Sequence, residues 1–302
     1  MFRKPHNKAI LALITANLIW GAASPIFKLS LENISPFLLA FIRFLGAALI
    51  LLPFAFSKLN INKRDIPKLV LLSLFGITLN ISFFFLGLKL SPSINAPIIA
   101  SSGPVLLYIF SIFILKEKTH PKVLVGLLVS LLGVLIIVGQ PIIENGFNVA
   151  IIGNLFFLLA TVGTVGHAIV SKSILDRYEA VTITFWSFII GSITFLPFAF
   201  IEIVNYNPLP ALDYRGILGI IFGIFLSSAL AYLLYEWGIK KIEAQEVGIF
   251  TYIDPVIAIM IAVPLLGEVV TTIFLLGSIL IFLGIAIAEG RLHYHPIHKL
   301  RS

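Results

Sequence analysis

Asp254 is the acidic residue best placed to take part in chemistry, because it lies inside a long apolar segment, 246–266. A run of about 20 apolar residues predicts a membrane-spanning helix, and at about 1.5 Å per residue this carboxyl group lies roughly 10 Å deep. Ionisable side chains at such depth normally face the bundle interior or a wet cavity, and some of them carry protons. Asp254 is therefore a candidate for proton coupling. The alternative is a structural acid that bonds backbone groups beside Pro255.

Uncharged polar and aromatic side chains recur at helical spacing along several other apolar segments. Because polar groups are costly in lipid, they normally turn toward the inside of a bundle, and together they would line one cavity for a small zwitterionic or amphipathic solute. The predicted solute-binding residues are Asn17, Trp20, Ser24, Asn80, Ser101, Tyr108, Thr164, His167, Ser227, Tyr232, Tyr235 and Tyr252. The alternative for the small and hydroxyl-bearing residues is helix–helix packing. For His167 the alternatives are a proton or ligand site and a hydrogen-bonded packing residue.

Pro104 and Pro255 each remove a backbone donor inside a predicted span, which frees a carbonyl and bends a helix. Bent or broken helices beside the binding site are a device of transporters. Each proline also precedes a glutamate, Glu117 or Glu268, by the same spacing. We therefore predict hinges at both prolines, with a passive kink as the alternative.

Four other charged residues have expected roles near or within the spans. Arg43 either snorkels outward, bonds the carbonyls of a neighbouring helix or binds solute directly. Glu117 and Glu268 follow their spans and are expected to tie loop backbone or the start of the next helix, where negative charge is favourable. Glu236 is expected to pair with Lys240, four residues further along the same helix.

The composition explains where these residues must sit. The chain has 302 residues, of which 59% are hydrophobic and only 12% charged, and its mean hydropathy is +1.07. A soluble domain carries about 25% charged residues, so this is a membrane protein. The net charge of +7 is spread between apolar segments and forms no basic stripe, which argues against nucleic acid. With no cysteine, disulfides, thiol catalysis and cysteine-bound metals are excluded.

Ten apolar segments are long enough to span a bilayer. The predicted spans are 9–28, 36–56, 67–88, 94–115, 122–140, 150–171, 180–201, 215–238, 246–266 and 270–289. With the N-terminus in the cytoplasm, 17 Lys and Arg residues fall on the cytoplasmic side and 3 outside. Since positive charge favours the cytoplasmic side, we predict a multi-pass plasma-membrane protein with both termini cytoplasmic.

The segment 87–139 occurs twice, the second time 151 positions later without a gap. Residues with identical partners are Gly87, Lys89, Pro104, Glu117, Gly126, Gly133 and Gly139, which meet Gly238, Lys240, Pro255, Glu268, Gly277, Gly284 and Gly290. The three glycines that close each copy suggest a packing stripe outside the cavity. Each half holds five spans, an odd number, so the halves enter the membrane in opposite directions. We predict an all-α membrane protein in which two inverted five-helix repeats, 9–140 and 150–290, surround a central cavity. This arrangement is typical of secondary transporters that work by alternating access.

Several short motifs resemble a known family. Ile19-Trp20-Gly21, Phe41-Ile42-Arg43-Phe44 and the matched Pro and Glu positions of both halves are similar to those of EamA-type transporters, in the drug/metabolite transporter superfamily. The resemblance implies a ten-helix fold with a central cavity and both ends cytoplasmic, carrying amino acids or related metabolites, often outward. The second half departs where Thr164-Val165 replaces the Trp-Gly pair.

Two other classes of function compete with a transporter. An intramembrane enzyme lacks support, because the chain has no Gly-x-Ser-x-Gly elbow, no His-Glu-x-x-His and no second intramembrane Asp. No P-loop is present for ATP-driven pumping. A channel-like facilitator remains an alternative to the transporter. The sequence predicts a transporter and no enzyme, with no metal and no cofactor. Its expected partners are a small-molecule substrate, lipid, and protons as the candidate coupling ion. A homo-oligomer is a further possibility that the sequence does not decide.

Overall fold

The computed structural model describes residues 4–103, 106, 121–146, 148–206, 211–241 and 250–289. Within these ranges the chain forms helices and no strands. The first part of the chain contains α1 (Lys4–Ser30), α2 (Pro36–Ala55), the short 3-10 turns η1 (Phe56–Lys58) and η2 (Lys63–Asp65), α3 (Ile66–Ser73), η3 (Leu74–Leu79), α4 (Asn80–Leu90), α5 (Asn95–Ala100) and α7 (Pro121–Asn145). The second part contains α8 (Ala150–Lys172), α9 (Ala180–Tyr206), α10 (Tyr214–Ile221), η5 (Phe222–Leu230), α11 (Ala231–Ile239), α13 (Ile253–Leu266) and α14 (Thr272–Glu289).

Within the described residues, seven helical stretches are long and apolar enough to cross a membrane. They are Lys8–Ser30, Pro36–Lys58, Lys63–Leu90, Leu124–Glu144, Ala150–Ser171, Ala180–Asn205 and Tyr214–Ile239. Each coincides with one predicted span, which confirms an all-helical architecture with membrane-length helices. The predicted spans 246–266 and 270–289 correspond to the shorter apolar helices α13 and α14. Most of the predicted span 94–115 lies outside the described residues, so the count of ten remains a prediction.

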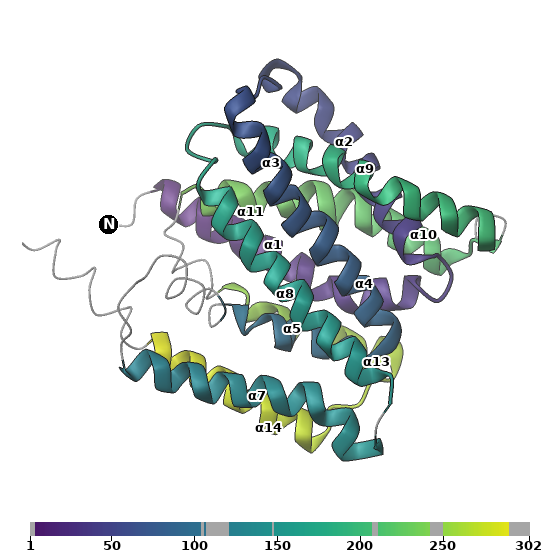
Figure 1. Ribbon diagram of the computed structural model, residues 1–302, viewed down its shortest axis with the longest axis vertical. Helices are drawn as coiled ribbons and strands as arrows, with labels where there is room; N and C mark the ends of the chain where they lie inside the picture. Colours follow the sequence, from purple (N-terminus) through teal and green to yellow (C-terminus); the bar gives the residue numbers. More distant parts are fainter. Residues whose placement is uncertain are drawn as a thin grey trace, which may run out of the picture.

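Helices of the first part pack mainly against helices of the second. The closest partners are α7 with α14, α2 with α9, and α4 with α8, while α1 lies between α11 and α13. Figure 1 shows α7 and α14 as a pair along one edge of the molecule and α2 beside α9 at the other side. The two parts of the chain therefore interlock through these helix pairs.

Small residues set the distance between α7 and α14. A Cβ atom added at Gly133 would lie 2.6 Å from the carbonyl oxygen of Gly277, and one at Gly284 would meet the backbone of Ser130 and Gly126. Because lipid gives helices no hydrophobic driving force to associate, van der Waals packing at such close backbone approach holds the two helices together. The predicted packing stripe is present at these positions. Gly139 takes no part in it, since a Cβ there would meet no atom within 4 Å.

Two membrane-length helices contain a π-helical stretch in their middle. One is η3, between α3 and α4, and the other is η5, between α10 and α11. π-helical turns are rare and occur mostly at functional sites. They occupy the third predicted span of each predicted half, and their residues reach the cavity described below. The sequence analysis did not predict them.

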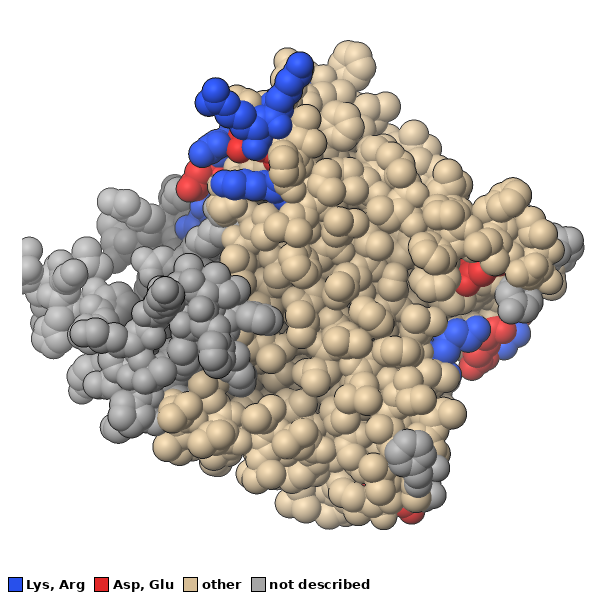
Figure 2. Space-filling model, in the orientation of Figure 1, with Lys and Arg blue, Asp and Glu red and all other residues tan. Residues whose placement is uncertain are grey.

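The outer surface carries large apolar side chains. Phe54, Phe200 and Ile193 are each more than 60% exposed. Figure 2 shows a broad face without Lys, Arg, Asp or Glu, with charged side chains gathered at two margins on opposite sides of it. A contiguous apolar surface of this extent marks contact with another apolar phase, and the uncharged band between two charged margins fits a bilayer.

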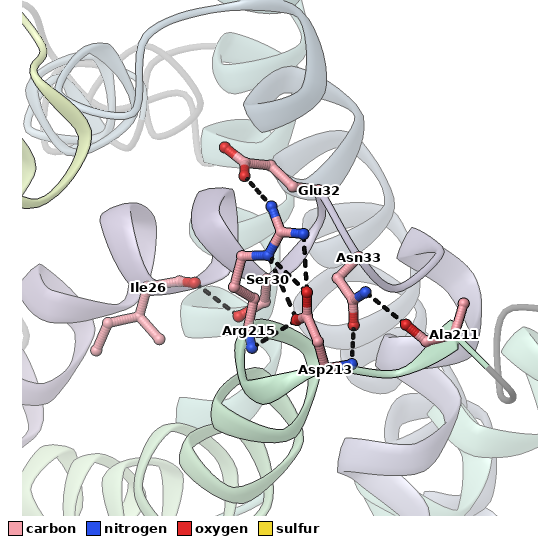
Figure 3. Close-up of polar contacts among 7 residues, drawn as sticks. All are labelled: Ile26, Ser30, Glu32, Asn33, Ala211, Asp213 and Arg215. Carbon is pink, nitrogen blue, oxygen red and sulfur yellow. Dashed lines mark hydrogen bonds and ion pairs between the residues drawn. The ribbon is translucent and has the colours of Figure 1, made fainter.

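One charged margin joins the end of α1 to the start of α10 (Figure 3). Arg215 donates to Glu32 (2.7 Å) and to Asp213 (2.8 Å), while Asn33 accepts from the Asp213 amide (2.9 Å) and donates to the carbonyl of Ala211 (2.9 Å). The hydrogen bonds from Arg215 hold the pKa of Asp213 below its ordinary value. A lowered pKa means that the stabilisation is complete at neutral pH and is lost only as the pH falls through that value.

The opposite margin has a similar set of contacts around the turn between α2 and α3. Asp65 accepts from Arg177 (2.8 Å) and from the hydroxyl of Tyr178 (2.8 Å), and Lys58 pairs with Glu179 (2.7 Å). The hydrogen bond from Lys58 holds the pKa of the Glu179 carboxyl below its ordinary value. The polar contacts that join the two parts of the chain thus stand at both ends of the uncharged band.

Candidate solute-binding cavity

A cavity of about 190 Å³ lies between the helices of the two predicted halves. Its walls come from α1, α2, η3, α4, α5, α8, η5, α11 and α13. Ten of the predicted site residues line it: Asn17, Trp20, Ser24, Asn80, Thr164, His167, Ser227, Tyr232, Tyr235 and Asp254. Since a water molecule occupies about 30 Å³ of liquid, the volume suits one small solute.

Two of the predicted solute-binding residues that the structure describes, Ser101 and Tyr252, are not part of this wall. Ser101 is buried and donates its hydroxyl to the carbonyl of Pro97 (2.9 Å), within its own segment. Tyr252 packs edge-on against Phe282, with 5.7 Å between ring centroids. Pro104 and Tyr108 lie outside the described residues.

Pro255 stands in the first turn of its helix and not in mid-helix as the sequence suggested. α13 begins at Ile253, after two turn residues, Thr251 and Tyr252. In a first turn the missing N–H of proline breaks no helical hydrogen bond. Pro255 therefore marks a helix start beside the cavity, next to the wall residue Asp254.

Aromatic side chains on α1 and α11 bond to the two π-helical stretches. Trp20 donates its indole N–H to the carbonyl of Ser227 (3.1 Å), and Tyr232 donates its hydroxyl to the carbonyl of Gly76 (3.3 Å). Residues 76 and 227 are 151 positions apart, the offset of the sequence repeat. Two carbonyls that are one repeat offset apart thus accept hydrogen bonds from cavity-lining aromatic residues.

Asn80 links the two predicted halves across another part of the wall. Its amide nitrogen donates to the carbonyl of Ala160 (2.8 Å) and to the hydroxyl of Thr164 (2.8 Å). Both acceptors are on α8, which packs against α4. Asn80 therefore fixes a helix pair as well as facing the cavity.

His167, Glu236 and Ser171 form a buried cluster at the edge of the cavity. Nδ1 of His167 lies 3.1 Å from the carbonyl of Leu72, and Nε2 lies 2.7 Å from Glu236 Oε1. Ser171 donates to Glu236 Oε2 (2.7 Å). Because a carbonyl only accepts, Nδ1 carries a hydrogen, so a single proton lies between Nε2 and the carboxyl group. The pair is neutral overall whichever atom holds that proton.

This cluster corrects the expected pairing of Glu236 with Lys240. Glu236 is 1% exposed and bonds His167 on another helix, whereas Lys240 donates to the carbonyl of Tyr178 (2.9 Å). The i+4 spacing placed the two residues on one helix but could not show that one turns inward and the other toward the margin.

Arg43, on α2, also lines the cavity and is 1% exposed. Its Nε donates to Ser228 Oγ (2.9 Å) and its Nη2 to Ser227 Oγ (3.1 Å). The guanidinium carbon lies 4.6 Å from the ring centroids of both Phe27 and Phe44. Nη1 has no hydrogen-bond partner. Burial excludes outward snorkelling, and the acceptors are hydroxyls and not the carbonyls that were one of the expected alternatives.

Among the described residues, four buried polar atoms of the cavity-lining residues lack a hydrogen-bond partner. They are Asn17 Oδ1, Ser24 Oγ, Asp254 Oδ1 and Arg43 Nη1. More than about 90% of buried polar groups in proteins are bonded, so a group of four on one wall is unusual. They are three potential acceptors and one cationic donor, each on a residue that lines the cavity.

Two charged residues near the cavity ends have structural partners. Glu268 accepts from the amides of Ser93 (2.7 Å) and Ile94 (3.0 Å), just before α5. Glu268 thus bonds backbone at the start of a helix, but this helix is α5 and not the next one in the chain, α14. Glu117 lies outside the described residues. Lys28 donates to the carbonyls of Leu88 (2.8 Å) and Ser91 (2.7 Å), at the end of α4, where positive charge is favourable.

The apolar part of the wall could not be recognised in the sequence. Phe27, Phe84 and Phe157 line the cavity, but they are three among 26 phenylalanines in apolar runs. No spacing signal distinguishes a cavity-facing Phe from one that faces lipid.

Comparison with known proteins gives the family. The profile of the EamA-like transporter family matches twice, over residues 7–139 and 151–289. The chain belongs to the EamA-like transporter family. An uncharacterized transporter of Archaeoglobus fulgidus is 26% identical over 295 residues, covering 95% of this chain and 99% of that one. A probable amino-acid metabolite efflux pump of Escherichia coli is 25% identical, over 98% of this chain and 99% of its own.

A crystal structure of another protein has the same fold. It matches with a TM-score of 0.67 at 21% identity, covering 97% of this chain and 98% of that chain. Together with the seven apolar helices, the family assigns this chain to multi-pass membrane transporters. The resemblance that the motifs suggested is thereby confirmed.

Proposed function

We propose that this protein is a secondary transporter that exports small organic solutes, amino acids or related metabolites. The observation that carries the proposal is the cavity, which both predicted halves line and whose wall presents four buried polar atoms without partners. Such a wall suits a solute that has both donors and acceptors. A relative named as a probable amino-acid metabolite efflux pump supports the direction and the solute class.

Alternating access is the mechanism that the repeat supports. We propose two inverted halves of five helices, 9–140 and 150–290, with both termini in the cytoplasm of a plasma-membrane protein. The bonds from Trp20 to Ser227 and from Tyr232 to Gly76 support this symmetry, since equivalent carbonyls accept them. Rocking one half against the other would open the cavity to each side in turn.

Asp254 is the proposed coupling residue of this cycle. It lines the cavity, and its Oδ1 is buried without a partner. An intramembrane carboxyl group in such a place can take up a proton on one side and release it on the other. Pro104 and Pro255 are the proposed hinges, because a helix break beside the site lets one wall move.

Counterflow in proteoliposomes tests the proposal. The purified chain is reconstituted with an unlabelled amino acid inside, and uptake of the same labelled amino acid is followed for each of the twenty common amino acids. A carrier gives transient, saturable accumulation of at least one of them, and Trp20→Ala reduces it. A channel gives uptake without saturation or counterflow, and an intramembrane enzyme gives neither; either result would reject the carrier.

A further inference from the structure

The buried guanidinium of Arg43 has no acidic partner. The ion pairs of the described residues join other side chains, and none includes Arg43. Its neighbours are two hydroxyl groups and aromatic rings, which are neutral. A buried charge normally has a partner of opposite sign, because desolvation costs more than neutral groups return.

The contacts of Arg43 hold the guanidinium plane in a fixed direction. Ser228 and Ser227 accept from Nε and Nη2, while Phe27 and Phe44 lie near its carbon. These bonds leave Nη1 as the free donor, on a residue that lines the cavity. A side chain with restricted rotamers loses little entropy when a ligand binds, so the arrangement is prepared for an anion.

We propose that Arg43 Nη1 binds the carboxylate of the transported solute, which makes α-amino acids the substrate class. This inference rests on the proposed transport function and adds the anchoring group. Arginine is suited to the task because its planar donors match a carboxylate. The charge balance of the wall also favours a monoanionic group, since Asp254 lies on the same wall and a doubly charged phosphate would add repulsion.

A solute that is held by its carboxylate would place its ammonium group toward the acceptors of the wall. The unpartnered acceptors are Asn17 Oδ1, Ser24 Oγ and Asp254 Oδ1. An ammonium group has three donors and no acceptor, so it matches this set. The aromatic rings of Trp20 and Tyr235, 5.1 Å apart between centroids, add an apolar surface for the rest of the solute.

The test compares each acid with its uncharged analogue on the purified full-length protein. Thermal stability in detergent is measured with the twenty common L-amino acids. Each one that stabilises the wild type is then titrated beside its carboxamide, for example L-leucine beside L-leucinamide. We expect at least one acid to bind, and its carboxamide to bind about 10- to 100-fold more weakly, because a hydrogen bond between charged groups is lost.

Variants of Arg43 separate direct binding from a structural role. Arg43→Gln should weaken the acid about 10- to 100-fold and leave the carboxamide unchanged, because the interaction that it removes is already absent there. Arg43→Lys should restore part of the affinity for the acid. The matched control is Arg64→Gln, an exposed arginine, which should leave both affinities as in the wild type.

Three results would overturn the inference: no amino acid stabilises the wild type, acid and carboxamide bind equally, or Arg43→Gln weakens both by the same factor. The first two need only the wild type, so a variant that fails to fold does not prevent the decision. Binding without counterflow would reject the proposed transport and leave the carboxylate site standing. Counterflow of acid and carboxamide alike would keep the carrier and reject the site.

Discussion

Asp254 lines the cavity, and its Oδ1 has no hydrogen-bond partner among the described residues. The residue lies in the first turn of α13, and its Oδ1 is buried and unbonded. The alternative role that the sequence suggested is a structural acid that bonds freed backbone groups. Such an acid would use both of its oxygens at the helix start. A free oxygen on the wall favours proton exchange, and this leads to the first prediction.

Asp254→Asn should abolish the response of transport to a pH gradient. For one exchanged proton, a one-unit gradient changes wild-type accumulation by about tenfold, whereas an amide at this position cannot carry the proton. Counterflow at equal pH should continue in the variant at reduced affinity, because the amide oxygen can still accept from the solute but carries no charge. The measurement is labelled amino-acid accumulation in proteoliposomes with and without the gradient, and Asp176→Asn, an exposed acid, is the control. An unchanged gradient response in Asp254→Asn would remove the coupling role.

The cluster of His167, Glu236 and Ser171 gives a second prediction, about stability. In the Glu236→Gln variant, the amide group can donate to Nε2 of His167 and accept from Ser171. The free energy of unfolding of this variant should therefore differ from that of the wild type by less than about 1 kcal/mol. Glu236→Ala leaves two buried groups unpaired and should lose about 1–3 kcal/mol. Denaturant unfolding in mixed micelles compares the two. Equal losses would mean that the cluster needs a full ion pair.

Residue roles were predictable from the sequence only where helical spacing decided them. Asn17, Trp20 and Ser24 share one face of α1, and all three line the cavity. Spacing failed for Ser101, whose hydroxyl turns back to its own segment. It also failed for Glu236, because its partner is 69 positions away on another helix. A local pattern carries no information about which distant helix will pack nearby.

At the scale of elements, no described side chain of α7 or α14 is part of the cavity wall. Its interface is made by Gly133, Gly277 and Gly284, where added Cβ atoms would meet backbone. A substitution in the interface between these two helices can therefore lower the stability of the protein without changing a cavity residue. Such a substitution separates effects on stability from effects on transport.

Gly133→Ala should destabilise the protein, since its Cβ would lie 2.6 Å from the carbonyl of Gly277 and the helices must move apart. Overpacking of this kind costs about 1–3 kcal/mol. The matched control is Gly139→Ala on the same helix, where the space is open and helix propensity adds up to about 1 kcal/mol. Thermal unfolding measures both, and counterflow per folded molecule should be the same. If the two variants were equally stable, the close approach would not hold the pair together.

Element positions were well predicted because a long apolar run has one use in a bilayer. The predicted span 180–201 falls within α9, and 150–171 within α8. The π-helical stretches η3 and η5 could not be predicted, since their composition does not differ from that of the flanking α-helices. Their role becomes visible only in the tertiary contacts, which are the bonds to the carbonyls of Gly76 and Ser227 and those from Arg43 to Ser227 and Ser228.

At the scale of the whole molecule, the two predicted halves are not separate bodies. Their helices pair across the boundary, as α2 does with α9 and α4 with α8, and the cavity lies where they meet. The proposed alternating access would require sliding and rocking at those shared interfaces. The opposite orientation of the halves is therefore the assumption on which alternating access depends, and it can be tested directly.

Lys118 and Val269 occupy equivalent positions of the two repeats, 151 residues apart. Lys118 lies outside the described residues, and Val269 is 73% exposed. In inverted halves one is cytoplasmic and the other external, as the distribution of Lys and Arg requires. The chain has no cysteine, so Lys118→Cys and Val269→Cys each carry a single thiol, and the wild type is the blank. A membrane-impermeant maleimide should label Val269→Cys in intact cells and Lys118→Cys only after the cells are opened. Labelling of both from the same side would mean that the halves are parallel, and a pair of parallel halves cannot exchange inward-open and outward-open states by symmetry.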